Sequence, residues 1–286
     1  MLPIKSFIEL SRPRNVLITG LAVIVGGIMA TWSIAGFASH LGLAAISASL
    51  IAAGGNSYND YCDRELDRFQ KALRPLPAGR ISPKAALVWT SFCFIGGMIL
   101  AGTISVIALL ICITAMLLLI VYSRYLKGLP LAGNMVVALA AALAFIYGGA
   151  AVRSVRGVIW AAWLAFLFHL GREIIKDLED REGDAAAGAK TLPAEYGVTA
   201  ARRGITVVFL LLAMSLPLPY YLGGYQIGYL IAALIGVLPA LVVTTTLAWI
   251  WSQPRQLHLL SSILKWDMLV GLLALYYGRP LPVWLA

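Results

Sequence analysis

The chain has 286 residues, of which 60% are hydrophobic and 12% charged, and its mean hydropathy is +0.86. A soluble globular chain carries about 25% charged residues, so water is not the main solvent of this protein. The formal net charge is +9. Because the basic residues lie between long apolar segments, this charge indicates membrane topology and an anionic ligand or lipid, and argues against nucleic acid.

Long blocks of the sequence contain no charged residue, and a membrane-spanning helix needs only about 20 apolar residues. Dividing these blocks at Gly, Pro and Ser/Thr breaks predicts nine spans. The predicted spans are residues 15–36, 41–62, 84–102, 105–125, 131–152, 157–178, 202–221, 226–250 and 262–279. We therefore expect an all-α polytopic membrane protein, with residues 1–286 forming a single domain.

The distribution of charge predicts the orientation in the membrane. Glu9 and Arg12 lie where a cleavable signal peptide would be apolar, so the first span is expected to serve as the insertion signal. Basic residues are enriched in cytoplasmic loops. With the N-terminus inside, 19 of the 22 basic and all 13 acidic residues lie on the cytoplasmic side, leaving Arg153, Arg156 and Arg279 outside. This pattern predicts a multi-pass protein of the cell membrane with a cytoplasmic N-terminus.

Most of the acidic residues lie in two segments, 60–67 at the end of the second span and 173–184 at the end of the sixth. Both segments have the spacing Asp-x-x-Asp-x-x-x-Asp, offset by 117 residues: Asp60, Asp63 and Asp67 in the first, and Asp177, Asp180 and Asp184 in the second. At about 100° per residue, each set lies on one helix face. The repeat predicts an internal duplication of a four-helix unit, helices 1–4 and 5–8, followed by a ninth helix.

Carboxylates that share one helix face repel one another, and desolvation near a membrane increases the cost. A solvated, salt-bridged helix end is the simplest alternative, but it gives no reason for the repeated register. Mg²⁺ prefers oxygen ligands and typically binds one or two carboxylates together with substrate phosphate oxygens. The two clusters therefore predict a Mg²⁺ site for a diphosphate, with the six aspartates as metal ligands and catalytic residues.

Basic residues adjoin both clusters and are suited to the charge of a diphosphate. They are Arg64, Arg68, Lys71, Arg74 and Arg80 after the first cluster, and Arg172, Lys176, Arg181 and Lys190 around the second. Each of them is also consistent with membrane topology or lipid headgroup contact alone. Arg74 and Lys176 adjoin the motifs most closely and are the strongest candidates to bind substrate.

The first cluster reads Asn59-Asp60-Tyr-Cys-Asp63-Arg-Glu-Leu-Asp67 and is followed by Arg74-Pro-Leu-Pro-Ala-Gly-Arg80. With the second aspartate pattern and the segment 122–127, the chain resembles the UbiA-type family of intramembrane prenyltransferases over nearly its whole length. The resemblance implies an isoprenyl diphosphate donor, Mg²⁺ and a lipid or aromatic acceptor. The substrate-binding residues expected on this basis are Asn56, Asn59, Arg74, Tyr122, Lys127, Arg172, Lys176 and Lys190.

Within that family, the segment 171–180 together with Lys190-Thr-Leu-Pro193 is most similar to the branch that transfers a geranylgeranyl group to geranylgeranylglyceryl phosphate, an ether-lipid precursor. That branch usually has an Asn and a Pro before the Arg-Pro pair, where this chain has Phe69-Gln-Lys-Ala-Leu73. An aromatic acceptor such as 4-hydroxybenzoate or homogentisate is an alternative with the same metal chemistry. A transporter is a remote alternative, because transporters place polar groups near the bilayer midplane.

The expected reaction is ionisation of the allylic C–O bond once Mg²⁺ neutralises the diphosphate. Aromatic faces can stabilise the resulting cation; the candidates are Tyr58, Tyr122, Phe145 and Tyr147. His169 and Asp267 are two further titratable residues within the predicted spans. For His169 packing is favoured over a role as base or ligand. Asp267 near Lys265 is equally consistent with ion pairing, with orientation of the acceptor and with catalysis.

Overall fold

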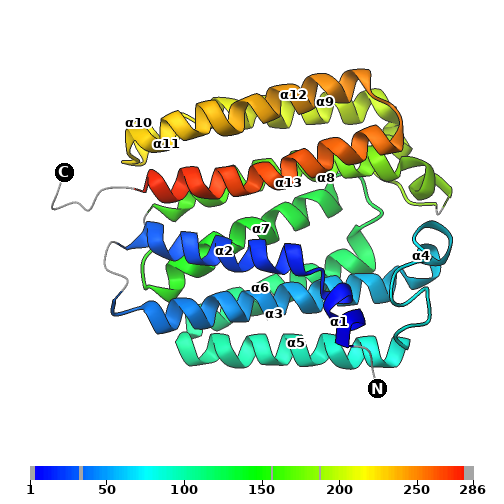
Figure 1. Ribbon diagram of the computed structural model, residues 1–286, viewed down its shortest axis with the longest axis horizontal. Helices are drawn as coiled ribbons and strands as arrows, with labels where there is room; N and C mark the ends of the chain where they lie inside the picture. Colours follow the sequence, from blue (N-terminus) through cyan, green and yellow to red (C-terminus); the bar gives the residue numbers. More distant parts are fainter. Residues whose placement is uncertain (1–3, 32–34, 156, 187, 280–286) are drawn as a thin grey trace.

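The computed structural model describes residues 4–31, 35–155, 157–186 and 188–279, which form α-helices and two short π-helical segments (Figure 1). The bounds are α1 Ile4–Ser11, α2 Pro13–Ala30, α3 Ala38–Cys62, α4 Arg64–Gln70, α5 Pro83–Ile104, α6 Val106–Val121, η1 Tyr122–Leu126, α7 Ala132–Ala151, α8 Val158–Ala186, α9 Leu192–Ser215, α10 Leu218–Leu222, α11 Ile227–Ala232, η2 Ala233–Val237, α12 Leu238–Ile250 and α13 Pro254–Tyr277.

Nine helical segments in these ranges are long and apolar enough to span a membrane, which confirms the predicted number. Several boundaries differ from the prediction. The first span ends at Ala30, and residues 32–34 of its predicted range lie outside the described residues. The sixth continues to Ala186, while the seventh and ninth begin earlier, at Leu192 and Pro254. Each of these extensions contains charged residues, so hydropathy alone could not assign it to a span.

The long helices lie side by side, and the charged elements gather at one end of the bundle (Figure 1). We call this the acidic end; it comprises α1, α4, residues 71–82, residues 122–131 and the last turns of α8. The opposite end carries Arg153 after α7 and Arg279 after α13, whereas Arg156 lies outside the described residues. Asp267 is an exception to this segregation of charge, because it is buried within α13.

Glycines bring α2 and α7 into contact backbone to backbone. In lipid, helices associate through close packing at small residues. A Cβ atom at Gly148 would lie 2.0 Å from the carbonyl oxygen of Val23, and one at Gly26 would lie 2.4 Å from the carbonyl oxygen of Phe145. Neither helix can accept a side chain at these positions without moving away from the other, and both helices contribute to the interior cavity described below.

We expect Gly148→Ala to destabilise the protein, because the added methyl group would push α7 away from α2. Overpacking of this kind costs about 1–3 kcal/mol, and a lower midpoint of thermal unfolding in detergent would report it. Gly102→Ala is the matched control, since a Cβ atom at this helical position in α5 meets nothing within 4 Å. Equal midpoints for the two variants would contradict the proposed backbone contact.

Candidate functional site

The first carboxylate cluster lies where α3 passes into α4. α3 ends at Cys62 and α4 begins at Arg64, with a turn at Asp63 between them. The prediction of one continuous helix was therefore wrong at this residue. The interruption is local, because the backbone N–H of Asp67 donates to the carbonyl of Asp63 at 2.8 Å. The chain keeps a near-helical path through the motif.

Two arginines neutralise the buried carboxylates of this cluster. Arg74 Nη1 lies 2.6 Å from Asp67 Oδ2 and 3.1 Å from Asp60 Oδ1. Arg12 forms a second ion pair with Asp60. Since Asp60 and Asp67 are only 4% and 3% exposed, these pairs offset charge that water does not solvate.

Two lysines connect the clusters to other elements of the acidic end. Lys127, directly after η1, forms an ion pair with Asp63. The Nζ atom of Lys71, directly after α4, lies 3.7 Å from Asp180 Oδ2. Because Lys71 follows the first cluster and Asp180 belongs to the second, the two clusters lie on neighbouring elements, as the sequence predicted.

The second cluster lies on the last turns of α8, which is continuous through all three aspartates. The continuous helix confirms the prediction for this segment. Asp177 Oδ2 accepts a hydrogen bond from Asn134 Nδ2 at 2.9 Å. One turn earlier, the buried Glu173 accepts from Arg172 at 2.9 Å and from Lys176 at 3.0 Å. These two predicted substrate-binding cations therefore share one carboxylate.

The electrostatics of the first cluster follow from burial. Burial raises the pKa of Asp67 above its ordinary value, although Arg74 acts to lower it. Burial alone would lower the pKa of Arg12, but the ion pair with Asp60 raises it overall. The cluster therefore holds negative charge only because cations lie beside it, and a bound metal ion would meet the same requirement.

The chemistry of the donors suits Mg²⁺. In the part of the chain that the structure describes, no three His, Cys, Asp or Glu side chains converge closely enough to form a metal cage on their own. Mg²⁺ does not need such a cage, because it usually takes one or two carboxylates and completes its shell with phosphate oxygens and water. Six carboxylates on neighbouring elements are available for this role.

An interior cavity of about 290 Å³ begins directly below the two clusters. Its polar mouth includes Asn56 and Glu173, which lie one helical turn before Asp60 and Asp177 respectively. A molecule with an anionic head at the carboxylates could therefore extend its apolar part into the bundle.

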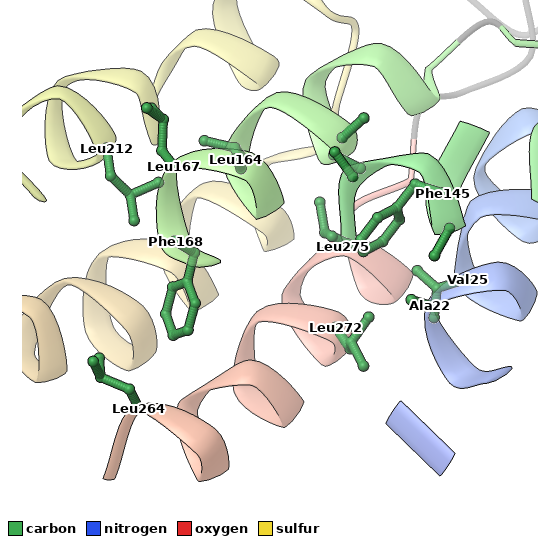
Figure 2. Close-up of a cluster of buried hydrophobic side chains, with 14 of the residues drawn as sticks. Ala22, Val25, Phe145, Leu164, Leu167, Phe168, Leu212, Leu264, Leu272 and Leu275 are labelled. Atoms are coloured by element: carbon green, nitrogen blue, oxygen red, sulfur yellow. The ribbon is translucent and has the colours of Figure 1, made fainter. Parts of the chain in front are cut away.

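The walls of the cavity are apolar and come from many helices. Side chains of α2, α7, α8, α9 and α13 converge in the interior, and Figure 2 labels several that line the cavity, among them Phe145, Phe168 and Leu272. The cavity reaches Leu216 and Tyr229 near the opposite end of the bundle. Its length and lining suit an extended hydrocarbon chain.

Two of the four predicted aromatic residues line this cavity, namely Phe145 and Tyr147. The Tyr147 hydroxyl lies 2.9 Å from Ser47 Oγ, to which it donates. Tyr58 and Tyr122 are not among the described lining residues. His169 lines the cavity wall, and Asp267 lines it without an ion pair to Lys265 among the described residues.

The remaining predicted residues differ in their surroundings. Asn59 Oδ1 accepts from Arg12 at 3.1 Å, whereas its buried Nδ2 has no partner among the residues described. Asn56 Nδ2 donates to the carbonyl of Ser11 at 3.0 Å. Lys190 is exposed, and its side chain forms no ion pair with either cluster in the described ranges. The structure thus brings the asparagines to the site but not Lys190.

Sequence reasoning missed Arg12 and Asn134 as parts of the site. Arg12 served only as a topology signal, and its contact with Asp60 joins residues 48 positions apart. Asn134 contacts a carboxylate 43 positions away. Asn134 is a polar residue at the start of an apolar span, which could have marked it as functional. No spacing rule, however, predicts which residue it contacts more than 40 positions away.

The fold and the site define an integral membrane protein with a charged site at the mouth of an apolar cavity. Comparison with known proteins gives the family: residues 17–266 match the UbiA prenyltransferase family. The chain belongs to this family, and it is a prenyltransferase.

Several relatives are similar over most of the chain. A digeranylgeranylglyceryl phosphate synthase from Methanopyrus kandleri is 39% identical over 273 residues, covering 94% of this chain and 97% of the relative. One from Halobacterium salinarum is 40% identical over 241 residues, covering 83% and 86%. A solved structure reported for digeranylgeranylglyceryl phosphate synthase in membranes has a TM-score of 0.79 at 30% identity, covering 98% and 99%. A UbiA homolog from Archaeoglobus fulgidus bound to GPP and Mg²⁺ has a TM-score of 0.74 at 21% identity, covering 95% and 99%, and shares the fold.

We expect Arg74→Gln to destabilise the metal-free protein, because it leaves Asp60 and Asp67 with less positive charge. Removing one partner of a buried pair costs about 3–5 kcal/mol; since Arg74 is 27% exposed, we expect about 1–3 kcal/mol after allowing for solvent screening. Without Arg74, the pKa of Asp67 rises further above its unfolded value. The loss of stability should therefore be largest at pH 7 and shrink as the pH falls and the Asp67 carboxyl group is protonated.

Thermal unfolding in EDTA between pH 7 and pH 5 measures this effect. Arg68→Gln is the control, because Arg68 pairs with Glu65 at the surface, where both side chains are more than half exposed. A difference between wild type and Arg74→Gln that stays constant with pH would contradict the assignment of Arg74 as the counter-ion of buried carboxylates.

Proposed function

We propose that the protein transfers a geranylgeranyl group from geranylgeranyl diphosphate to the free hydroxyl of geranylgeranylglyceryl phosphate, which forms an ether-lipid precursor. The observation that carries the proposal is the long apolar cavity whose mouth lies one turn below both carboxylate clusters. Relatives at 39% and 40% identity that are digeranylgeranylglyceryl phosphate synthases support this donor and acceptor.

The proposed metal ligands are Asp60, Asp63, Asp67, Asp177, Asp180 and Asp184. Mg²⁺ at these carboxylates supplies charge neutralisation for the diphosphate leaving group. The homolog bound to GPP and Mg²⁺ supports this assignment through its shared fold. Arg74 and Lys127 donate to the first cluster, and we expect them to donate to diphosphate oxygens as well.

The cavity has two proposed roles in the reaction. Its apolar walls bind the prenyl chain and keep water from the allylic carbon, which becomes cationic as its C–O bond to the diphosphate breaks. The rings of Phe145 and Tyr147 lie deeper in the wall, because Tyr147 donates to Ser47, which is 13 residues before Asp60 on α3, or about 20 Å. They are therefore too far from the allylic carbon for the contact of about 6 Å that stabilises a cation, and they line the part of the cavity that would bind the prenyl chain. The acceptor hydroxyl oxygen then forms the new C–O bond and releases its proton, so the products are the ether, diphosphate and one proton.

Two further proposals concern the architecture. The end of the bundle that we call acidic also carries most of the basic residues of the chain. Because basic residues are enriched on the cytoplasmic side of membrane proteins, this supports a cytoplasmic location for that end and for the N-terminus. The two aspartate motifs, at the ends of α3 and α8, have the same spacing. This supports a duplication in which membrane spans 1–4 correspond to spans 5–8, with the ninth span added.

We expect Asp60→Asn and Asp177→Asn to lower turnover by at least about 10²-fold, since each removes a charged metal ligand while keeping the shape of the side chain. The measurement uses purified protein with labelled geranylgeranyl diphosphate and Mg²⁺, with geranylgeranylglyceryl phosphate and 4-hydroxybenzoate offered side by side. EDTA should stop the transfer in wild type.

Glu182→Gln is the control for the second cluster, because this carboxylate lies in the same segment but is 74% exposed. Full activity in either aspartate variant would overturn the metal-site assignment. Label that enters only the aromatic ring would keep the metal chemistry and replace the proposed acceptor.

We expect Ala161→Phe to shorten the cavity, because Ala161 lines it near the start of α8, far from the acidic end. Turnover should fall with geranylgeranyl diphosphate and change little with the shorter geranyl diphosphate. Ile159→Phe is the control, since Ile159 lies on the same turn and is 63% exposed. An equal loss with both donors would show that the cavity does not bind the distal part of the prenyl chain.

A further inference from the structure

A group of cations lies beside the cavity mouth, apart from the aspartate clusters. Arg172 of α8 and Lys265 of α13 both line the cavity. Arg172, Arg14, Lys176 and Arg12 all lie near enough to the Lys265 ammonium group to repel it. Cationic side chains from the start of α2 and from α8 therefore lie near Lys265 of α13. Helix α13 packs beside both α2 and α8 (Figure 1).

The positive charge of this group is not balanced by the protein. Lys265 and Arg14 form no hydrogen bond or ion pair within the described ranges, and Arg172 and Lys176 share the single carboxylate of Glu173. The Nε atom of Arg172 is buried and has no partner there. Arg172, Lys176 and Lys265 thus face one carboxylate beside an apolar cavity, where unpaired charge is costly. Arg14 is exposed at the start of α2, and Arg12 is balanced by Asp60.

Asp267 does not relieve this imbalance, although it is two residues from Lys265 in the sequence. Residues two positions apart on a helix do not face each other, and no ion pair joins these two in the part of the chain described. The group therefore has the properties of an anion site: a buried donor without a partner, excess positive charge, and an apolar cavity directly beside it.

We propose that Arg172 and Lys265, assisted by Arg14, bind the phosphate monoester of the lipid acceptor. The proposal rests on the transfer reaction proposed above. A phosphate monoester carries up to two negative charges and suits several cations with an arginine fork. Arg172 lies five residues before Asp177, about 7 Å along α8, so an anion held there is separate from a diphosphate at the aspartates and lies close to its allylic end.

The position also suits the rest of the acceptor. A phosphate held at Arg172 and Lys265 places the adjoining glycerol at the cavity mouth, where its free hydroxyl can reach the allylic carbon. The acceptor's own prenyl chain then lies against apolar walls or lipid. The site would thereby select a phosphorylated acceptor over the same lipid without its phosphate.

The test compares two acceptors, geranylgeranylglyceryl phosphate and geranylgeranylglycerol, in wild type, Lys265→Gln and the surface control Lys84→Gln. We expect Lys265→Gln to raise the KM for the phosphorylated acceptor by about 10- to 100-fold, the cost of losing one charge-assisted hydrogen bond. The KM for geranylgeranyl diphosphate and for the unphosphorylated acceptor should stay unchanged. Equal effects on both acceptors, or a rise in the donor KM, would overturn the site.

A binding measurement without donor separates this proposal from the reaction itself. Wild type should be thermally stabilised by geranylgeranylglyceryl phosphate more than by geranylgeranylglycerol, and Lys265→Gln should lose the difference. If this holds while wild type transfers no label, the phosphate site stands and the proposed reaction fails. If wild type transfers label but Lys265→Gln matches it in KM and stabilisation, the reaction stands and the site fails.

Two further ligands, added in the same thermal-stability measurement, identify which kind of phosphate the site binds. Inorganic phosphate alone and vesicles of an anionic phospholipid should give no stabilisation that depends on Lys265. Stabilisation by either of them equal to that by the phosphorylated acceptor would overturn the assignment to the acceptor lipid and identify a site for free phosphate or for bulk lipid headgroups.

Discussion

The neutralisation of buried carboxylates at one end of the bundle is the constraint on which the rest of the site depends. Asp60, Asp67 and Glu173 are each less than a tenth exposed, and a charge at such a depth is tolerated only beside an opposite charge. The chain meets this demand at a local cost: Arg12 has a left-handed backbone conformation (φ 55°) between α1 and α2, which costs an L-residue about 1–2 kcal/mol. This turn lets Arg12 reach Asp60.

The same constraint explains why the site faces an apolar cavity rather than water. Ion pairs and metal–phosphate contacts are stronger where the local dielectric is low, and an allylic cation survives only where water is excluded. The helices provide both conditions, because the polar mouth at Asn56 and Glu173 is one turn deep and apolar walls follow directly. The close contact of α2 with α7 at Gly26 and Gly148 brings two of these walls together.

The sequence predicted those features that depend on local pattern. Hydropathy predicted nine spans, and the repeated spacing predicted that α8 carries Asp177, Asp180 and Asp184 on one helix. It did not predict the turn at Asp63, where helical spacing continues although the helix is interrupted. Nor could it assign Arg12 or Lys265 to the site, since their neighbours are set by the packing of helices distant in sequence and a basic residue near a span satisfies topology equally well.

The two halves of the proposed duplication differ in a way that bears on the substrates. The aspartates keep their register, but the residue one turn before them is the neutral Asn56 in the first half and the acidic Glu173 in the second, where Arg172 and Lys176 accompany it. Among the described residues, the second half therefore brings Arg172 to the cavity wall, and Lys265 of the ninth span, which lies outside the repeat, adds to it. The first half contributes Arg14 from outside the wall. A symmetric pair of aspartate motifs suffices for one diphosphate. The asymmetry beside it supplies what a second, anionic substrate requires, namely a place where positive charge exceeds negative charge at the depth of the reacting carbon.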